Sequence, residues 1–263
     1  MIKAMYTAGT GMNAQQIVID NIANNLANIS TNGFKQGQAS FQDLVYLNLR
    51  EPGALSSQGQ QVPTGLQIGA GSGINAITKL FTQGTLTNTG NALDIAINGN
   101  GFLQVTLPDG ETRYTRDGSL RLNSVGNLVN TNGYLISPQV TIPQTAVSVS
   151  IASDGTVSVV NAGATNSSTI LGQLTLATFI NPAGLGADGL NLYEETASSG
   201  TPTLSTPGLN GAGLLQEGYL EGSNVDVVGG LVALIVAQRA YEFNTRVITV
   251  SDNMLDTTAQ LIH

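Results

Sequence analysis

The sequence contains no cysteine and no tryptophan, and its one histidine is the last residue, His263. Without cysteine the chain has no disulfide, no thiolate metal ligand and no cysteine nucleophile. Without an internal imidazole it has neither a Ser-His-Asp triad nor a histidine-ligated zinc site. Charged residues make up 10% of the 263 residues, against roughly 25% in an ordinary soluble domain. These absences exclude much enzyme chemistry, and they predict a mostly neutral, polar surface.

Positive charge and long apolar runs are also scarce. Nine Lys and Arg stand against 17 Asp and Glu, for a net charge of −8, whereas a nucleic-acid-binding protein needs clustered basic residues. The longest apolar run, residues 227–237, has eleven residues including two glycines, and a membrane span needs about 20. Only Arg239 lies near this run, so a membrane-surface helix, which carries basic residues on its polar face, is disfavoured against buried oligomer core. The polar residues of the first segment argue against a cleaved signal peptide.

The N-terminal segment has the apolar repeat of a coiled-coil helix. Apolar residues recur every seven positions, and a second series follows three positions later, with Gln15 as its one polar member. This is an a/d heptad pattern, and Asn32-Gly33 provides a stop signal. We therefore predict a helix over about 3–29, whose seam consists of Met5, Met12, Ile19 and Leu26 together with Ala8, Gln15, Ile22 and Ile29.

The C-terminal segment repeats this pattern and adds a second apolar stripe. One series is Leu234, Tyr241, Ile248, Leu255 and Ile262; the other is Val236, Ala240, Phe243, Val247, Val250, Met254 and Leu261. At 100° per residue the two stripes lie on different sides of the helix, so the helix needs apolar neighbours on both. Asn224 or Asp226 can cap it, while Gly229-Gly230 leaves its exact start open.

Between the two helices the pattern changes to that of β-strands. Segments such as 93–97, 102–107, 147–151, 157–160 and 174–179 alternate or are rich in β-branched residues, and nine glycines follow Asn or Asp, as in tight hairpins. The predicted fold is α+β, mainly β, with long N- and C-terminal helices paired as a coiled coil and an inserted all-β domain of short antiparallel strands. The expected domains are 1–35 with 223–263 as a discontinuous helical domain, a connecting segment at 36–80, and a β-rich outer domain at 81–222.

Three patterns suggest chemistry but have simpler explanations. The glycines of 184–189 match G-x-G-x-x-G, but no amphipathic helix follows, so we expect a loop rather than a dinucleotide site. Glu194 and Glu195 are adjacent and would point to opposite faces of a strand. Asp117, beside Arg113 and Arg116, is expected to form a hairpin salt bridge. We predict no catalytic, cofactor-binding or metal-binding residue.

Asparagine-rich segments flank both helices. The stretch 23–35 reads ANNLANISTNGFK, and 221–226 is followed by QRAYEFN at 238–244. Asparagine is a mediocre helix former that bonds backbone groups instead. We therefore expect these amides to bind carbonyls of neighbouring turns or of neighbouring chains.

These segments resemble the paired terminal signatures of the bacterial flagellar rod and hook protein family: ANNLANISTNGFK (23–35), SNVD (223–226) and QRAYEFN (238–244). YTRDGSLRLNSVGNLVNTNGYLI (114–136) is similar to the β segment of that family. FQDLVYLNLREPGALSS (41–57), PTGLQIGAGS (63–72) and FTQGTLTNTGNALDIAINGNGF (81–102) resemble its distal-rod members most. The chain departs from the pattern at Val227–Gly230, where acidic residues usually stand.

The resemblance implies a structural, self-assembling subunit of the distal rod, the hollow and rigid drive shaft that transmits motor torque to the hook and filament and forms part of the export channel. It implies export without a cleaved signal peptide, location in the basal body within the periplasm, no cofactor, and a distal-rod insertion at about 46–68. The implied partners are other copies of the chain, proximal rod proteins, the hook protein and the P- and L-ring proteins.

The resemblance and the seams together predict a set of subunit-interface residues. Alternatives remain open: another axial subunit (proximal rod or hook), a secreted β-type module that binds cell-wall glycan through exposed aromatic residues, or, last, a hydrolase with two carboxylates. The predicted interface residues are Met5, Met12, Ile19, Asn24, Asn25, Leu26, Asn28, Leu234, Gln238, Arg239, Tyr241, Asn244, Ile248 and Leu255.

Overall fold

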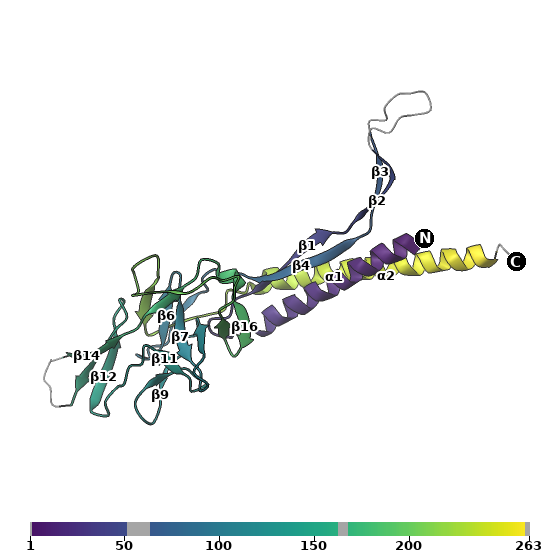
Figure 1. Cartoon of the computed structure of the whole chain (residues 1–263). Coiled ribbons are helices and arrows are strands. Elements are labelled where there is room, and N and C mark those ends of the chain that lie inside the picture. The colour runs from purple at the N-terminus through teal and green to yellow at the C-terminus, as the bar shows by residue number, and fades with distance from the viewer. Residues whose placement is uncertain (1, 52–63, 163–167, 261–263) are drawn as a thin grey trace. The chain divides into compact units, whose positions relative to one another are not determined.

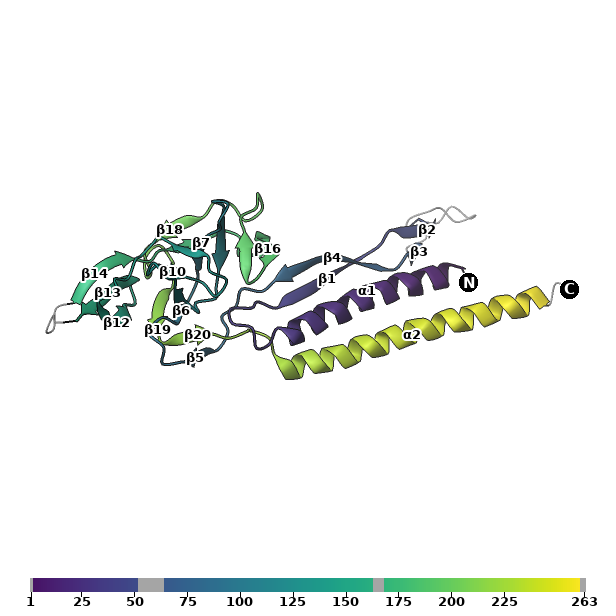
Figure 2. The same cartoon turned by 90° about the horizontal axis from the view of Figure 1, so that it is seen from below.

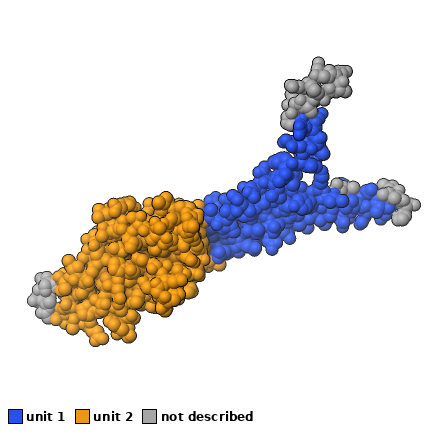
Figure 3. All heavy atoms as spheres, viewed as in Figure 1, with its two compact units in different colours: residues 1–26, 37–78, 226–263 blue, residues 27–36, 79–225 orange. Residues whose placement is uncertain are grey.

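A computed structural model describes residues 2–51, 64–162 and 168–260. The chain divides into two compact units, which Figure 3 colours separately. We call the first, formed by Met1–Leu26, Gly37–Thr78 and Asp226–His263, the helical unit. We call the second, formed by Ala27–Gln36 and Lys79–Val225, the β unit. The N-terminal third of the chain and its C-terminal end thus contribute to the same unit.

The helical unit contains two long helices that lie side by side in both views (Figures 1 and 2). Helix α1 spans Ile2–Ala27 and helix α2 spans Val227–Gln260, which confirms the two helices predicted from the heptads. Helix α2 begins at Val227 because the Asp226 carboxylate accepts bonds from the backbone N–H groups of Val228 (3.1 Å) and Gly229 (3.2 Å). Asp226 is therefore the N-cap, and Gly229-Gly230 lies inside the first turn.

Two pairs of strands accompany the helices in this unit. Strand β1 (Gly37–Asp43) pairs with β4 (Ser72–Lys79), and β2 (Tyr46–Arg50) pairs antiparallel with β3 (Leu66–Gly69). Strands β2 and β3 lie at the two ends of the predicted insertion at 46–68, and we call them its arms. Its central part, 52–63, lies outside the described residues.

The β unit is built on an antiparallel sheet in which β7 pairs with three strands, β8, β11 and β15. A three-stranded sheet (β12–β13–β14) and two pairs (β6 with β19, β5 with β20) complete the unit. Within the described residues the main sheet has nine strands: β7 Phe102–Thr106, β8 Thr112–Thr115, β9 Arg121–Leu122, β10 Leu128–Val129, β11 Leu135–Ser137, β15 Leu176–Thr178, β16 Gly186–Gly189, β17 Leu192–Glu194 and β18 Thr203–Ser205. The others are β5 Leu86–Asn88, β6 Ile95–Asn98, β12 Ala146–Ile151, β13 Thr156–Asn161, β14 Ser168–Gln173, β19 Leu214–Glu217 and β20 Tyr219–Glu221.

The β unit has a closed apolar core. Its main cluster takes inward-facing residues from β6, β7, β12 and β13, including Ile97, Leu103 and Val157, all nearly inaccessible to solvent. A second cluster is aromatic, with rings in edge-to-face pairs 4.8–5.8 Å apart. The alternation seen in the sequence therefore places one face of each strand in a common interior.

The Asn-Gly and Asp-Gly turns behave as predicted with one exception. Eight of the nine glycines have positive φ, for example Gly110 (+89°) in the β7–β8 hairpin. Gly118 does not have a positive φ; a Cβ there would collide with the carbonyl of Ile95. At this position glycine is needed for a close backbone approach rather than for a left-handed conformation.

Candidate assembly surface

The buried residues of α1 and α2 have small side chains. Ala8 and Ala14 of α1 and Ala237 and Ser251 of α2 are buried. A Cβ on Gly11 would lie 2.9 Å from the amide nitrogen of Asn244. Each of these small side chains buries little apolar area. The pair therefore leaves much of the apolar surface of α2 outside its own contact.

The second stripe of α2 is exposed in this chain. The exposed fractions are 62% for Val236, 61% for Phe243, 44% for Val247, 50% for Val250 and 51% for Met254. Full burial of such a side chain is worth roughly 1.5–3 kcal/mol, so covering the remaining half of five of them is worth on the order of 5 kcal/mol. A contiguous apolar surface of this kind marks an interaction site.

Two asparagines of α1 bind the start of β1. The Asn25 amide brackets Gly37: its Nδ2 donates to the Gly37 carbonyl at 2.9 Å, and its Oδ1 accepts from the Gly37 N–H at 2.9 Å. Asn21 Nδ2 donates to the same carbonyl at 2.8 Å. A Cβ at Gly37 would lie 2.6 Å from the Asn21 side-chain oxygen. Asn21 and Asn25, the second of which belongs to the asparagine-rich signature, thus hold the chain where it enters β1.

The predicted interface residues fall into three groups. Most are half-buried along the helical pair, whereas Asn24, Gln238, Arg239 and Tyr241 are exposed. Asn28 lies in the β unit and accepts a bond from the Thr31 hydroxyl at 3.1 Å. The half-buried group consists of Met5, Met12, Ile19, Asn25, Leu26, Leu234, Asn244, Ile248 and Leu255.

The β unit contains a buried ionic cluster that sequence reasoning missed. Glu221 Oε1 accepts from Lys35 Nζ at 2.6 Å, and Glu221 Oε2 accepts from Arg116 Nε at 3.0 Å. The side chains of Lys35 and Glu221 are 0% exposed, and that of Arg116 is 4% exposed. One carboxylate thus faces two cations, and Arg116 also donates hydrogen bonds through Nη1 to the carbonyls of Gly99 and Gly101. Lys35 ends the ANNLANISTNGFK signature, and this cluster explains why a lysine stands there.

Burial and charge act in opposite directions on the pKa of Glu221. Burial raises it, but the Arg116 guanidinium, the Lys35 ammonium and the Gly84 N–H together hold the pKa below its usual value. Burial lowers the pKa of Lys35, and the nearby Arg116 charge lowers it further. The carboxylate is thus ionised at neutral pH and stabilises both cations.

The salt bridge predicted for Asp117 is wrong. Arg113 instead pairs with Glu111 (2.7 Å) and Asp188 (3.0 Å), while Arg116 turns inward to Glu221. Asp117 accepts from the backbone N–H and the hydroxyl of Ser119. Arg116 and Asp117 follow the end of β8 at Thr115, and each charged side chain in this segment has a partner elsewhere, so closeness in sequence does not pair these charges.

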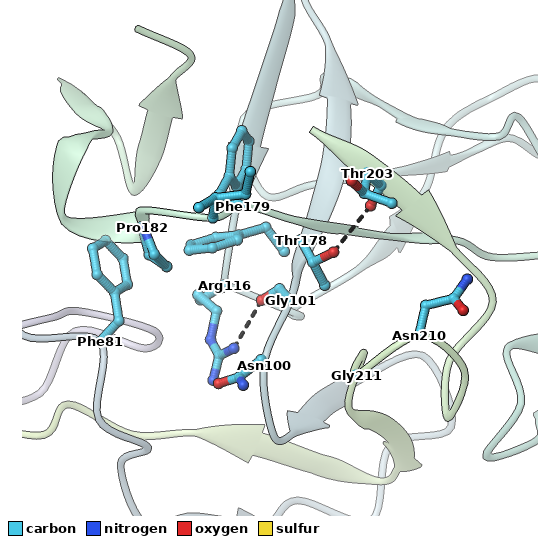
Figure 4. Close-up of a pocket in the computed structure, with 12 residues that line it drawn as sticks. Phe81, Asn100, Gly101, Arg116, Thr178, Phe179, Pro182, Thr203, Asn210 and Gly211 are labelled. Atoms are coloured by element: carbon cyan, nitrogen blue, oxygen red, sulfur yellow. Dashed lines mark hydrogen bonds between the residues drawn. The ribbon is translucent and has the colours of Figure 1, made fainter. Parts of the chain in front are cut away.

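A cavity of about 380 Å³ lies in the β unit beside the aromatic cluster (Figure 4). Phe81, Phe102 and Phe179 form its aromatic side, and the Arg116 guanidinium faces it while bonded to Gly101. Phe102 and Phe179 are buried, and Tyr193, whose pKa burial raises to about 12, packs edge-to-face on Phe102. These rings form core, not the exposed aromatic platform that a glycan-binding module would present.

The two remaining motifs also have structural roles. The segment 184–189 does not open a helix: Gly186–Gly189 forms β16 and turns into β17. The loop expected here is instead mostly a strand, and no helix follows the glycines as a dinucleotide-binding turn would require. Glu194 ends β17, with its carboxylate 3.9 Å from Arg113.

Comparison with known proteins identifies the family. Residues 5–35 match the flagella basal body rod protein family, residues 96–159 match the flagellar hook protein FlgE/F/G D1 domain, and residues 216–261 match the flagellar basal body rod FlgEFG protein C-terminal domain. The chain is 49% identical over 261 residues to the flagellar basal-body rod protein FlgG of Buchnera aphidicola subsp. Acyrthosiphon pisum, covering 99% of this chain and 100% of the relative.

Relatives from other bacteria align over nearly the whole chain as well. FlgG of Caulobacter vibrioides is 46% identical over 99% of both chains, and FlgG of Bacillus subtilis is 38% identical over 97% of both. No helix among the described residues is long and apolar enough to cross a membrane. The matched signatures are those that build the helical pair, the Gly37 bracket and the ionic cluster, and the chain belongs to the FlgG family of flagellar basal-body rod proteins.

Proposed function

We propose that this protein is the self-assembling structural subunit of the flagellar distal rod, a hollow shaft that transmits torque and forms part of the export channel. The observation that carries the proposal is the exposed second stripe of α2, a heptad surface with no covering partner in the part of the chain that the structure describes. Full-length similarity to basal-body rod proteins supports the same role.

In this proposal the terminal segments 1–35 and 223–263 form the inner helical layer and 81–222 the outer β domain. The interface residues are those predicted above, from Met5 to Leu255. The partners are further copies, the proximal rod and hook proteins, and the surrounding P- and L-ring proteins. The location is the rod within the periplasm, reaching the outer membrane, and the role is mechanical, without catalysis.

The arms of the insertion support the distal rod over another axial subunit. Strands β2 and β3 expose an apolar ribbon that includes Leu47, Leu49 and Leu66. A two-stranded ribbon with apolar side chains is marginal alone, and we propose that it wedges between neighbouring copies and stiffens the tube. Deletion of 46–68 should give tubes that bend more easily; unchanged stiffness would favour a proximal-rod or hook-type role.

The assembly role is tested by placing a charge in the stripe. We expect Phe243→Asp to remain folded as an isolated chain, because the side chain is exposed, but to form no tubes, because burying an unpaired carboxylate is costly. The matched control is Asn253→Asp, a new charge on an exposed position of the same helix outside the stripe, which should assemble. Electron microscopy and sedimentation report the result; normal tubes from Phe243→Asp would refute the proposal.

A further inference from the structure

The chain passes between the helical unit and the β unit four times, at 26–27, 36–37, 78–79 and 225–226. At the last three of these passages the chain leaves the β unit after Gln36, enters it at Lys79 and leaves it after Val225. Any load on these passages is carried by the backbone segments that meet there.

Asn224 bonds to both other segments. Its Oδ1 accepts from the Gln36 N–H at 2.8 Å. Its Nδ2 donates to the Leu80 carbonyl at 2.8 Å and to the Thr82 hydroxyl at 2.9 Å. A single amide on the third segment thus holds the first through its oxygen and the second through its nitrogen. No hydrocarbon or carboxylate side chain can do both, because the site needs one acceptor and one donor.

Further bonds join the same three segments beneath Asn224. Leu80 N–H donates to the Gln36 carbonyl at 2.9 Å. Lys35 Nζ bonds both the Thr82 carbonyl and Glu221, each at 2.6 Å, and Gly84 N–H donates to Glu221 at 3.0 Å. Glu221 and Lys35 are fully buried, whereas Asn224 is half-buried. We call this set of polar contacts the clasp. The Asn224 amide lies at its outer end, and the ionic cluster forms its inner end.

We propose that Asn224 is a positioning residue that fastens, within the β unit, the segments at three of the four passages to one another, so that these three backbone segments share a load instead of acting as independent hinges. The load in question is the torque of the proposed rod function, and the inference rests on that function. The clasp itself belongs entirely to the β unit. Asn224 is thereby assigned a mechanical role and no role in subunit contact.

The test begins with the full-length monomer and hydrogen–deuterium exchange. In Asn224→Ala we expect the Gln36 and Leu80 amides to exchange about tenfold faster. Local opening at these amides costs less free energy in this variant, because it no longer has to break the hydrogen bonds made by Asn224. In Asn224→Asp the carboxylate can still accept from Gln36 but cannot donate to the Leu80 carbonyl, so Leu80 should lose more protection than Gln36. Asn181→Ala, which removes an amide bonded to the Ser198 carbonyl elsewhere in the β unit, is the matched control and should change neither.

The second measurement is the persistence length of assembled tubes, from electron micrographs. Asn224→Ala should assemble like the wild-type chain but form more flexible tubes, and Asn181→Ala should match the wild type in both. Unchanged exchange at Gln36 and Leu80, unchanged stiffness, or exchange that rises equally throughout the β unit would each overturn the inference. So would a failure of Asn224→Ala to assemble while the wild type does. A wild-type chain that forms no tubes would instead count against the proposed function, and the exchange pattern would still decide whether the clasp exists.

Discussion

The two units of this chain bury their apolar residues to very different extents. In the β unit the strands place residues such as Leu103 and Val157 in an interior that excludes solvent, and an ionic cluster lies fully buried beside it. In the helical unit the buried positions of the two helices are small residues, while the large apolar side chains of α2 face outward. The β unit encloses its own apolar core, whereas the helical unit leaves large apolar side chains of α2 exposed.

The largest expected effect is in the β unit, at its buried charge. Glu221→Gln keeps the shape but leaves Lys35 and Arg116 buried without their anion, which should cost about 3–5 kcal/mol. Tyrosine near-ultraviolet circular dichroism during urea unfolding reports the change. Glu217→Gln, at a less buried carboxylate bonded to Ser150, should cost less than about 1 kcal/mol. Equal stability of the two variants would contradict the role of the cluster.

Matched truncations in the two units should differ sharply. Leu103→Ala, at a side chain that is 0% exposed, should destabilise the β unit by about 2–5 kcal/mol. Val250→Ala, at a side chain that is half exposed, should change the stability of the isolated chain by less than about 0.5 kcal/mol. A large loss in the second variant would show that the isolated chain already buries the stripe. Denaturant unfolding of the monomers gives both values.

Acid should weaken the β unit through Glu221. Because the folded-state pKa of this carboxyl is lowered, its contribution to stability is present above the unfolded-state pKa of about 4.3 and is lost as the pH falls through the folded-state pKa. The free energy of unfolding should therefore decline below about pH 4.5, and this part of the decline should vanish in Glu221→Gln. A pH profile that is the same in both chains would exclude Glu221 as its cause.

A smaller loss than those at Glu221 and Leu103 is expected at the start of α2. Asp226→Ala removes the side chain that accepts from Val228 and Gly229, which should cost about 1 kcal/mol. The loss should appear as reduced helicity by far-ultraviolet circular dichroism, with the unfolding of the β unit unchanged. Asn224→Ala should leave helicity intact, because Asn224 bonds the β unit and not the helix. An equal loss of helicity in the two variants would mean that Asn224 and Asp226 both cap α2.

The repeating features of this chain were predictable from the sequence. Heptads located both helices because the 3.5-residue pattern follows from helix geometry, and Asn-Gly or Asp-Gly located turns because glycine adopts positive φ readily. The sequence left two candidates for the cap, and hydrogen bonds to Val228 and Gly229 select Asp226.

The clasp and the ionic cluster were not predictable in the same way. Lys35 and Glu221 are 186 positions apart, and no periodicity relates them. The prediction that Asp117 pairs with Arg113 or Arg116 failed because it used closeness in sequence, whereas the actual partners of the two arginines include Asp188 and Glu221, which are distant in sequence. One signal was available: a lysine and a glutamate, each at the edge of an asparagine-rich signature, at the two ends of an inserted domain. Such residues are brought together whenever the ends of the insert meet.

The absence of native cysteine allows the central claim, that the exposed stripe of α2 is covered by neighbouring copies, to be tested directly. Single-cysteine variants Val247→Cys, in the stripe, and Asn253→Cys, outside it, would be labelled with a maleimide as monomers and as assembled tubes. The account predicts that both react as monomers, and that only the cysteine at 253 still reacts in tubes. Rapid labelling at 247 in well-formed tubes would show that copies assemble without covering the stripe, and would contradict the account.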